Sequence, residues 1–389
     1  MLDRILVLRP GGRDRSADSG CAGFARWGVL SAFVVLSACG GSSSSPSTNL
    51  PSSWRIAAAG STHTLAVGAD GTAWAWGSNA YGQVGGSSTS SLRTSPVQVA
   101  LGYALVAAGG RHSLAVSAGG TLFAWGDNSH GQLGDGGAGG VQLIPEAIGN
   151  GYLAASGGDY HSIALKSDGT LWTWGDNSHG QLGDGTTTGK ETPAQIAGSY
   201  QWVDAGGSHT IAIAQDGTLW AWGDNTYGEL GDGTTAERDT PVLVGAGFAS
   251  ASTGPAHTVA VKSDGTLWAW GDNQFGELGD GTTASRLSPV QVGTGFASAS
   301  AGSGFTVAVK TDGTLWAWGV NAYGELGDGT TTTRTSPVQV GTGFASASAG
   351  AYHAVAVKTD GTLWAWGYNA FGQLGDGTTT NRTSPVPVR

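Results

Sequence analysis

The stretch KSDGTLWAWGDNQFGELGDGTT occupies residues 262–283, and a nearly identical sequence, KTDGTLWAWGVNAYGELGDGTT, follows 48 residues later at residues 310–331. The Trp of a Trp-Gly pair marks every copy of this repeat: Trp76, Trp125, Trp174, Trp222, Trp270, Trp318 and Trp366. Successive markers are 49, 49, 48, 48, 48 and 48 residues apart. Seven evenly spaced copies thus fill the chain from about Trp54 to Arg389, and such a fixed period indicates a repeat architecture.

The fifth copy shows what one repeat builds. FASASTG (248–254), HTVAVKS (257–263) and TLWAWG (266–271) read as strands, and Asp264-Gly265 separates the last two. Asp-Gly between β-rich runs predicts a hairpin with a type I′ turn, which needs a positive φ at both central residues. The same pair begins at Asp70, Asp168, Asp216, Asp312 and Asp360, and the second copy has Gly119-Gly120 there.

A long loop and a last strand complete the copy. DNQFGELGDGTTASR (272–286) is rich in Gly, Asp and Asn, and SPVQV (288–292) carries a Pro that suits an edge strand. Four short antiparallel strands, repeated seven times, predict an all-β, seven-bladed β-propeller of four-stranded antiparallel blades. The two Trp of each LWAW run share one face of the strand, so we expect them in the core between blades.

Composition agrees with a compact β-repeat. Only 12% of the residues are charged and 69 of 389 are Gly, which disfavours long helices. Beyond residue 38 the chain keeps 13 basic and 25 acidic residues, a net charge near −12, which disfavours binding to nucleic acid phosphates. Both cysteines, Cys21 and Cys39, precede the repeats, so the propeller has no internal disulfide.

The N-terminal segment is typical of an export signal. RWGVLSAFVVLSA (26–38) is an apolar run after a single Arg, too short to span a bilayer comfortably. It ends in Leu36-Ser37-Ala38-Cys39, which resembles the lipobox of bacterial lipoproteins. We therefore expect a signal peptide over residues 1–39, a lipid on Cys39, a flexible Gly/Ser tether over 40–53 and the propeller over 54–389. An ordinary signal peptide cleaved nearby is the alternative.

This reading places the protein at a bacterial cell envelope. Gly40, rather than Asp, follows the lipobox Cys, and by the rule for Gram-negative lipoproteins this implies the outer membrane. The membrane is then contacted through the lipid alone.

The repeat also resembles that of a known protein family. SGGDYHSIALKSDGTLWTWGDNSHGQLGDG (156–185) resembles the repeat of the regulator of chromosome condensation family, and all seven copies over residues 54–389 match it. The resemblance implies a seven-bladed propeller. The family's founder catalyses guanine-nucleotide exchange with a wedge that protrudes from one blade, whereas the constant spacing here leaves no room for such an insertion. A secreted bacterial relative inhibits β-lactamases by covering their active site with one face.

Six copies begin their second strand with a His, which we expect to form an inner ring. The residues are His63, His112, His161, His209, His257 and His353, and the sixth copy has Phe305 instead. Residues on different blades are too far apart to share a zinc ion, which needs ligands at about 2 Å. We expect a structural ring whose imidazoles hydrogen-bond neighbouring backbone, and no metal or cofactor. The loop GDNSHGQLGDG (175–185) also lacks the ligand run of an EF-hand, and Asn and Asp cap such turns themselves.

The long loop holds an aromatic ring in every copy, followed by Gly and then Gln or Glu. These rings are Tyr81, His130, His179, Tyr227, Phe275, Tyr323 and Phe371. Packing against the blade is the favoured interpretation; the alternative is an exposed outer ring beside Glu229, Glu277 and Glu325. No nucleophile motif, P-loop or Cys-x-x-Cys stands out and the last three copies are almost interchangeable, so we expect no enzyme activity.

The sequence therefore predicts a monomeric propeller that binds an unidentified protein through one loop face. Inhibition of a secreted or periplasmic enzyme is the alternative, and nucleotide exchange a second one. The Asp-Gly end of the blades reads as small and nearly featureless, so we predict binding at the long-loop end. The candidate residues are Arg111, Tyr160 and Tyr352 beside the His ring, with Tyr227, Phe275 and Tyr323 outside it.

Overall fold

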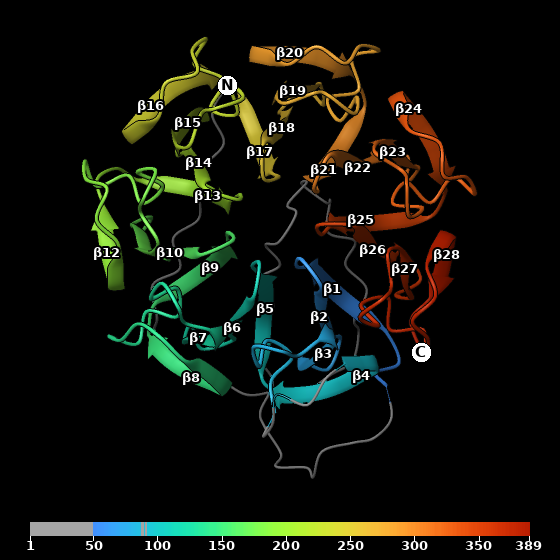
Figure 1. The fold of residues 1–389 in the computed structure, drawn as a ribbon, viewed down its shortest axis with the longest axis horizontal. Helices are drawn as coiled ribbons and strands as arrows, with labels where there is room; N and C mark the ends of the chain where they lie inside the picture. Colours follow the sequence, from blue (N-terminus) through green and yellow to red (C-terminus); the bar gives the residue numbers. More distant parts are fainter. Residues whose placement is uncertain (1–49, 87–88, 90–91) are drawn as a thin grey trace, which may run out of the picture.

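A computed structural model describes residues 50–86, 89 and 92–389. In these residues the chain forms 28 strands in seven four-stranded antiparallel sheets, arranged as blades around a central axis (Figure 1). The predicted all-β, seven-bladed propeller is confirmed. The predicted signal peptide, the lipobox and residues 40–49 of the tether lie outside the described residues. Among the residues described, no helix has the length and hydropathy that a membrane crossing requires.

The strands follow one another blade by blade along the chain. The first three blades are β1 (Trp54–Ala59), β2 (His63–Gly68), β3 (Thr72–Ser78) and β4 (Leu92–Leu101); β5 (Tyr103–Ala108), β6 (His112–Ser117), β7 (Leu122–Asp127) and β8 (Val141–Gly149); β9 (Tyr152–Gly157), β10 (His161–Lys166), β11 (Leu171–Gly175) and β12 (Lys190–Ile196). The fourth and fifth blades are β13 (Tyr200–Ala205), β14 (His209–Ala214), β15 (Thr218–Gly223) and β16 (Arg238–Ala246); β17 (Phe248–Thr253), β18 (His257–Lys262), β19 (Leu267–Gly271) and β20 (Arg286–Gly293). The last two are β21 (Phe296–Ala301), β22 (Phe305–Lys310), β23 (Leu315–Gly319) and β24 (Arg334–Gly341); β25 (Phe344–Ala349), β26 (His353–Lys358), β27 (Leu363–Gly367) and β28 (Arg382–Pro387).

The Asp-Gly hairpin differs from the expected two-residue turn. The backbone N–H of Gly265 donates to the carbonyl of Lys262 at 2.9 Å, and that of Lys262 donates to the carbonyl of Thr266 at 2.9 Å. The loop therefore has three residues, with the glycine alone in the left-handed region at a φ of 80°. Asp264 is needed for another reason: its Oδ1 accepts the backbone N–H of Thr266 at 2.9 Å and the Thr266 hydroxyl at 2.6 Å.

The fourth strand lies on the outer rim of each blade, and the first lies next to the central axis (Figure 1). In the fifth blade the rim strand, β20, is longer than the predicted 288–292, and Pro289 lies within it. A rim strand has one unpaired edge, so the missing N–H of proline costs no ladder hydrogen bond there.

The hydrophobic core lies between the blades. Trp318 of the sixth blade is completely buried and packs against Val259, Leu267 and Leu278 of the fifth. Its indole Nε1 donates to the backbone carbonyl of Glu277 in the fifth blade at 2.8 Å. The same packing and the same hydrogen bond recur for the second Trp of all seven LWAW-type strands.

The buried histidines add a second lateral link. His257 Nε2 lies 3.0 Å from the hydroxyl of Thr306 in the next blade, and that hydroxyl donates to the same Glu277 carbonyl at 2.8 Å. Because the hydroxyl hydrogen is used in this way, the imidazole Nε2–H is the donor to the Thr oxygen. The equivalent pairs are His63–Ser113, His112–Ser162, His161–Thr210, His209–Thr258 and His353–Thr64. The partner is thus a side chain of the next blade and not the expected neighbouring backbone.

Burial fixes the charge of these imidazoles. It lowers the pKa of His257 to about 4 and that of His63, His112, His161, His209 and His353 to about 3. The rings are therefore neutral at physiological pH and serve as hydrogen-bond donors rather than charges.

The sixth and seventh blades replace this pair by an apolar one. Phe305 takes the place of the histidine, and Ala354 takes the place of the hydroxyl residue that it would face; both are completely buried and belong to one core cluster. The two departures match. His beside Ala would leave the buried imidazole N–H without an acceptor, and Phe beside Thr would remove the imidazole donor to the Thr oxygen.

The ring closes without a strand shared between its ends, because every blade consists of consecutive strands. The first and seventh blades instead meet through the same lateral contacts as the others. Thr64 Oγ1 accepts from His353 Nε2 at 2.9 Å and donates to the Gln373 carbonyl at 2.8 Å, and Trp76 Nε1 donates to that carbonyl at 2.8 Å. The backbone N–H of Trp54 adds a bond to the Gly361 carbonyl at 2.7 Å.

The matched pair of Phe305 and Ala354 generates a stability prediction. His257→Phe alone and Thr306→Ala alone should each destabilise the propeller, because the first removes the imidazole donor to the Thr306 oxygen and the second leaves the buried His257 Nε2–H without its acceptor. The double variant reproduces the natural apolar pair, so we expect it to be more stable than the sum of the single effects by about 1 kcal/mol or more. Urea unfolding followed by circular dichroism measures the cycle. Strictly additive effects would contradict a direct interaction between the two side chains.

Candidate interaction face

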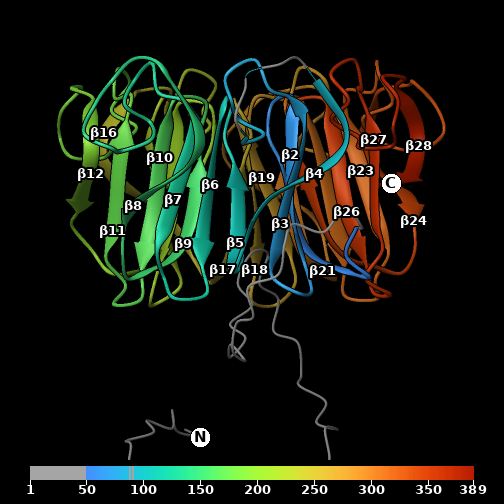
Figure 2. The ribbon, with the colours of Figure 1, turned by 90° about the horizontal axis from the view of Figure 1, so that it is seen from below.

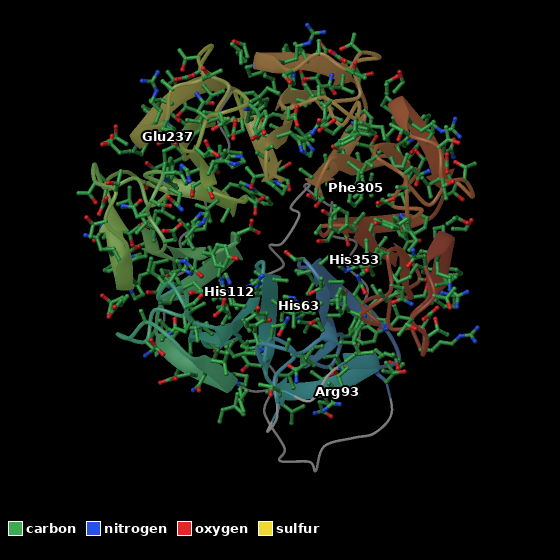
Figure 3. All side chains as sticks on the ribbon, in the orientation of Figure 1. His63, Arg93, His112, Glu237, Phe305 and His353 are labelled. Carbon is green, nitrogen blue, oxygen red and sulfur yellow. The ribbon has the colours of Figure 1, made fainter. Side chains whose placement is uncertain are left out.

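The disc has two chemically different faces, which lie at the upper and lower edges of Figure 2. We call the upper one the long-loop face; it carries the loops between the third and fourth strands and the turns before the second strands. We call the lower one the Asp-Gly face; it carries the short hairpins and the connections between blades. The His ring lies beneath the long-loop face, near the inner ends of the blades, as Figure 3 shows for His63, His112 and His353.

The long loops are held by hydrogen bonds within each loop. In the fourth blade, Asn225 Oδ1 accepts the backbone N–H of Leu230 at 3.0 Å, and its Nδ2 donates to the carbonyl of Ala236 at 3.0 Å. Asp232 Oδ2 accepts from Arg238 Nε at 2.9 Å, with the terminal nitrogen at 2.6 Å. These internal bonds satisfy the carboxylate and amide groups that a calcium site would need, and they give the loops a fixed shape.

The three loop glutamates are not part of an exposed acidic ring. Glu229, Glu277 and Glu325 are at most 2% exposed. The carboxylate of Glu229 turns inward and accepts the backbone N–H of Tyr227 at 2.7 Å, and the other two make the same bond at 2.8 Å. The four remaining copies make it with the amide oxygen of Gln83, Gln132, Gln181 or Gln373. The alternative of an outer ring beside exposed acids is therefore wrong for the glutamates, because the bond needs only a side-chain oxygen at this position.

The aromatic rings of the loops are exposed in five of the copies, and His130 is one of them. The exposed fractions are 47% for Tyr227, 42% for Phe275, 43% for Tyr323 and 37% for Phe371. For these rings the alternative of an exposed outer position is the correct one, and packing against the blade is not.

The last two blades gather four rings into one surface, which we call the tyrosine patch: Tyr323, Tyr352, Tyr368 and Phe371. The ring centroids of Tyr323 and Tyr368 are 4.8 Å apart, and those of Tyr323 and Tyr352 are 6.1 Å apart. Phe371 joins through Tyr368 at 6.1 Å. The sequence reasoning missed Tyr368, although it departs from the repeat: the residue after Trp-Gly is Asp in the second to fifth copies.

The first three blades form a second surface, which we call the arginine patch: Tyr81, Arg111, His130 and Tyr160. The exposed Arg111 guanidinium lies 4.6 Å from the ring centre of Tyr81 and 5.9 Å from that of Tyr160. His130 lies over Tyr160 with the ring centroids 4.6 Å apart. Of the six predicted binding residues, four thus fall into the two patches, and Tyr227 and Phe275 lie on the blades between them.

The Asp-Gly face is not featureless, contrary to expectation. Lys262 extends over two rings, with its Nζ 4.4 Å from the ring centre of Trp268 and 5.0 Å from that of Phe248. Lys166, Lys310 and Lys358 make the same arrangement in their own blades. The Lys, the Phe or Tyr and the Trp come from three strands, so the contact is visible only once the blade is folded. Because the arrangement repeats in four blades, it is best explained as cover for the first Trp of the LWAW-type strand in those blades.

The buried glutamates generate a pH prediction. Burial raises the pKa of Glu229 and Glu277 from the ordinary value of 4.5 to about 7 and also raises that of Glu325. Because the pKa is higher in the folded state than in the unfolded chain, the protonated glutamates contribute fully to the free energy of unfolding below pH 4.5. This contribution is lost as pH rises through 7. The free energy of unfolding of Glu277→Gln should therefore exceed that of the parent protein by roughly 1–3 kcal/mol at pH 8 and should equal it near pH 4.5. Urea unfolding at several pH values measures this.

The reverse substitution is the control. Gln373→Glu places the same carboxyl at the equivalent position of the seventh copy and should make stability fall between pH 5 and pH 8. Identical pH profiles for the parent protein and both variants would contradict the raised pKa.

Comparison with known proteins agrees with this fold. A family model described as the RCC1-like domain matches residues 35–247, which is more than half of the chain. The model of the regulator of chromosome condensation (RCC1) repeat matches residues 264–309, 312–357 and 360–389, and a second model of this repeat matches 248–277, 296–325 and 344–373. A sequence search among curated proteins found no match.

Solved structures of the same fold are only distantly similar in sequence. Human WBSCR16 is 21% identical with a TM-score of 0.73, over 82% of this chain and 94% of that one. Yeast RCC1 (Prp20), solved bound to Kap60, is 21% identical with a TM-score of 0.73, over 81% of this chain and 83% of that one. Prp20p of Saccharomyces cerevisiae, in a structure whose description includes its binding to Gsp1p and histones, is 20% identical with a TM-score of 0.68, over 78% and 82%. The repeat, the propeller and the matching family models together show that the chain belongs to the RCC1-repeat family.

Proposed function

We propose that this protein is a non-enzymatic scaffold, anchored to a bacterial envelope membrane by a lipid on Cys39, that binds a protein partner through its long-loop face. The observation that carries the proposal is the tyrosine patch, in which Tyr323, Tyr352 and Phe371 are 37–43% exposed and linked through Tyr368. Large exposed aromatic side chains are the commonest anchors of protein interfaces, because they bury much area while ordering few torsions.

The patch is not required by the fold. The buried Trp and Asn of the Trp-Gly pair and its loop recur in all seven copies, whereas Tyr352 and Tyr368 occupy positions that hold Ala256 and Asp272 in the fifth copy. A difference confined to surface positions of one region is expected for a site that recognises a partner rather than for a packing requirement.

The point where the chain enters the propeller supports the choice of face. Ser53 and Trp54 lie on the Asp-Gly face, where the carbonyl of Ser53 accepts the backbone N–H of Ala69 at 3.0 Å and Trp54 bonds Gly361. A membrane tether that ends here would leave the Asp-Gly face toward the bilayer and the long-loop face pointing away from it, free to meet a partner.

The comparisons support protein binding in general terms. A relative of this fold, yeast RCC1, was solved with Kap60 bound to it, but at 21% identity only the fold carries over. The even spacing of the copies disfavours nucleotide exchange, since no blade contains an insertion long enough for a wedge. The six imidazoles are neutral and already engaged between blades, which supports a non-enzymatic role. Inhibition of a secreted or periplasmic enzyme is one form that partner binding could take.

A capture experiment with matched variants tests the face. The full chain is used as bait in envelope extract, and each captured protein is then titrated against Tyr323→Ser/Tyr352→Ser/Tyr368→Ser and, as control, Lys262→Ser/Lys310→Ser/Lys358→Ser. We expect the tyrosine variant to lose tenfold or more in affinity, about 1.4 kcal/mol, and the lysine variant to keep it. An enzyme as the chief captured protein would favour inhibition. A loss of affinity in the lysine variant alone would place binding on the Asp-Gly face and contradict the proposal.

Metabolic labelling tests the anchor separately. Cells grown with radioactive palmitate should label the parent protein, and Cys39→Ser should abolish both the label and recovery in the membrane fraction. A protein that carries no label, or whose label survives Cys39→Ser, rules out the lipid anchor. Neither result bears on which face binds a partner.

A further inference from the structure

One group of metal-ligating side chains lies on the long-loop face between the third and fourth blades. His179 stands in the loop after β11, Asp224 directly follows β15, and Glu237 directly precedes β16. One ligand atom from each of the three lies within 4.8 Å of the others. Figure 3 labels Glu237 at the outer rim of the disc beside β16, well away from the buried His ring.

Within the part of the chain that the structure describes, the group occurs once, although its positions recur from copy to copy. The loop position of His179 is Tyr or Phe in five copies, and the position of Glu237 is Ser285, Thr333 or Asn381 in the last three. The second copy also has a histidine, His130, but this ring stacks on Tyr160 and its Nδ1 lies 2.9 Å from the hydroxyl of Ser129. The propeller therefore needs none of these three side chains for its packing.

The contacts of the group favour a protonated imidazole at His179. His179 Nδ1 lies 2.8 Å from Glu237 Oε1, so a single proton is shared between the imidazole and the carboxylate. The hydrogen bond with Glu237 raises the pKa of His179, and the nearby carboxylates of Asp224 and Asp176 raise it further. Thr226 occupies only one oxygen of Asp224, Oδ1, through its backbone N–H at 3.0 Å and its hydroxyl at 2.7 Å.

We propose that His179, Asp224 and Glu237 form a binding site for a divalent cation of the zinc type. One imidazole nitrogen and two carboxylate oxygens are the ligands that zinc accepts, and three protein ligands leave a position for water. Around an ion with ligands at about 2.0–2.1 Å, ligand atoms lie roughly 3.3 Å apart, so the present spacing needs only side-chain rotation. The side chains of His179 and Glu237 are 40% and 51% exposed, which leaves them free to rotate and open to ions from solution.

The cation replaces the shared proton. Binding deprotonates the imidazole, and the two carboxylates then neutralise the charge of the ion. Because the histidine comes from the third blade and the two carboxylates from the fourth, the ion would link neighbouring blades on the face proposed for partner binding. The sequence reasoning expected no metal because it considered the buried ring and the loop of a single copy, whereas this group combines two copies.

Titration of the full chain, purified without a histidine tag, tests the site without reference to a partner. We expect one Zn²⁺ per chain by isothermal titration calorimetry at pH 7, with weaker binding at pH 5, and a visible absorption band when Co²⁺ is the probe. His179→Ala and Glu237→Gln should each weaken Zn²⁺ binding tenfold or more, whereas the matched control His130→Ala should leave it unchanged. Circular dichroism verifies that each variant is folded.

Three outcomes would overturn the proposal. They are no Zn²⁺ binding at pH 7, binding that persists in both His179→Ala and Glu237→Gln, and equal loss in His130→Ala, which would indicate non-specific contact with surface histidines. Absence of binding together with an elevated His179 pKa by NMR would identify the group as an ion pair only. None of these results depends on whether the tyrosine patch binds a protein.

Discussion

The structure depends on one backbone carbonyl in each long loop, which accepts a Trp indole of the next blade and, at six of the seven blade boundaries, a Ser or Thr hydroxyl as well. The Glu277 carbonyl accepts both the Trp318 indole and the Thr306 hydroxyl, and His257 donates to that hydroxyl in turn. Because the blades share no strands, such lateral bonds and the buried indoles are what join them, including the first blade to the last. The same carbonyl belongs to the long loop, so the contact that closes the ring also fixes the surface above it.

Different residue positions therefore serve the packing of the blades and the binding of a partner. Positions that face the next blade are nearly constant, and where one changes, its partner changes too, as Phe305 and Ala354 show. Positions that project from the loops vary from copy to copy without a compensating change. In a propeller of this kind, single loop side chains can therefore be exchanged at little cost in stability. The tyrosine patch, the arginine patch and the histidine–carboxylate group all lie at such loop positions.

Much of this architecture is predictable from the sequence, because period and alternation are properties of the chain itself. The spacing of the Trp-Gly pairs, the LWAW strands and the rim Pro residues suffice for the number of blades and the order of their strands. Side-chain direction is not predictable in the same way. Glu229 reads as an exposed acid but turns inward to a backbone N–H, and the hairpin Asp264 serves through its side chain rather than through a positive φ. Contacts such as Lys262 over Trp268, or His179 beside Glu237, join residues whose proximity arises only when strands or blades are assembled.

The central claim is that the long-loop face, directed away from the membrane, is where this protein meets its partner. Site-specific photocrosslinking in living cells tests it most directly, with a photoreactive amino acid placed either at Tyr352 on the long-loop face or at Asp264 on the Asp-Gly face. The account predicts a discrete crosslinked protein from position 352 and none from position 264. A crosslink to a protein from position 264 alone would contradict it.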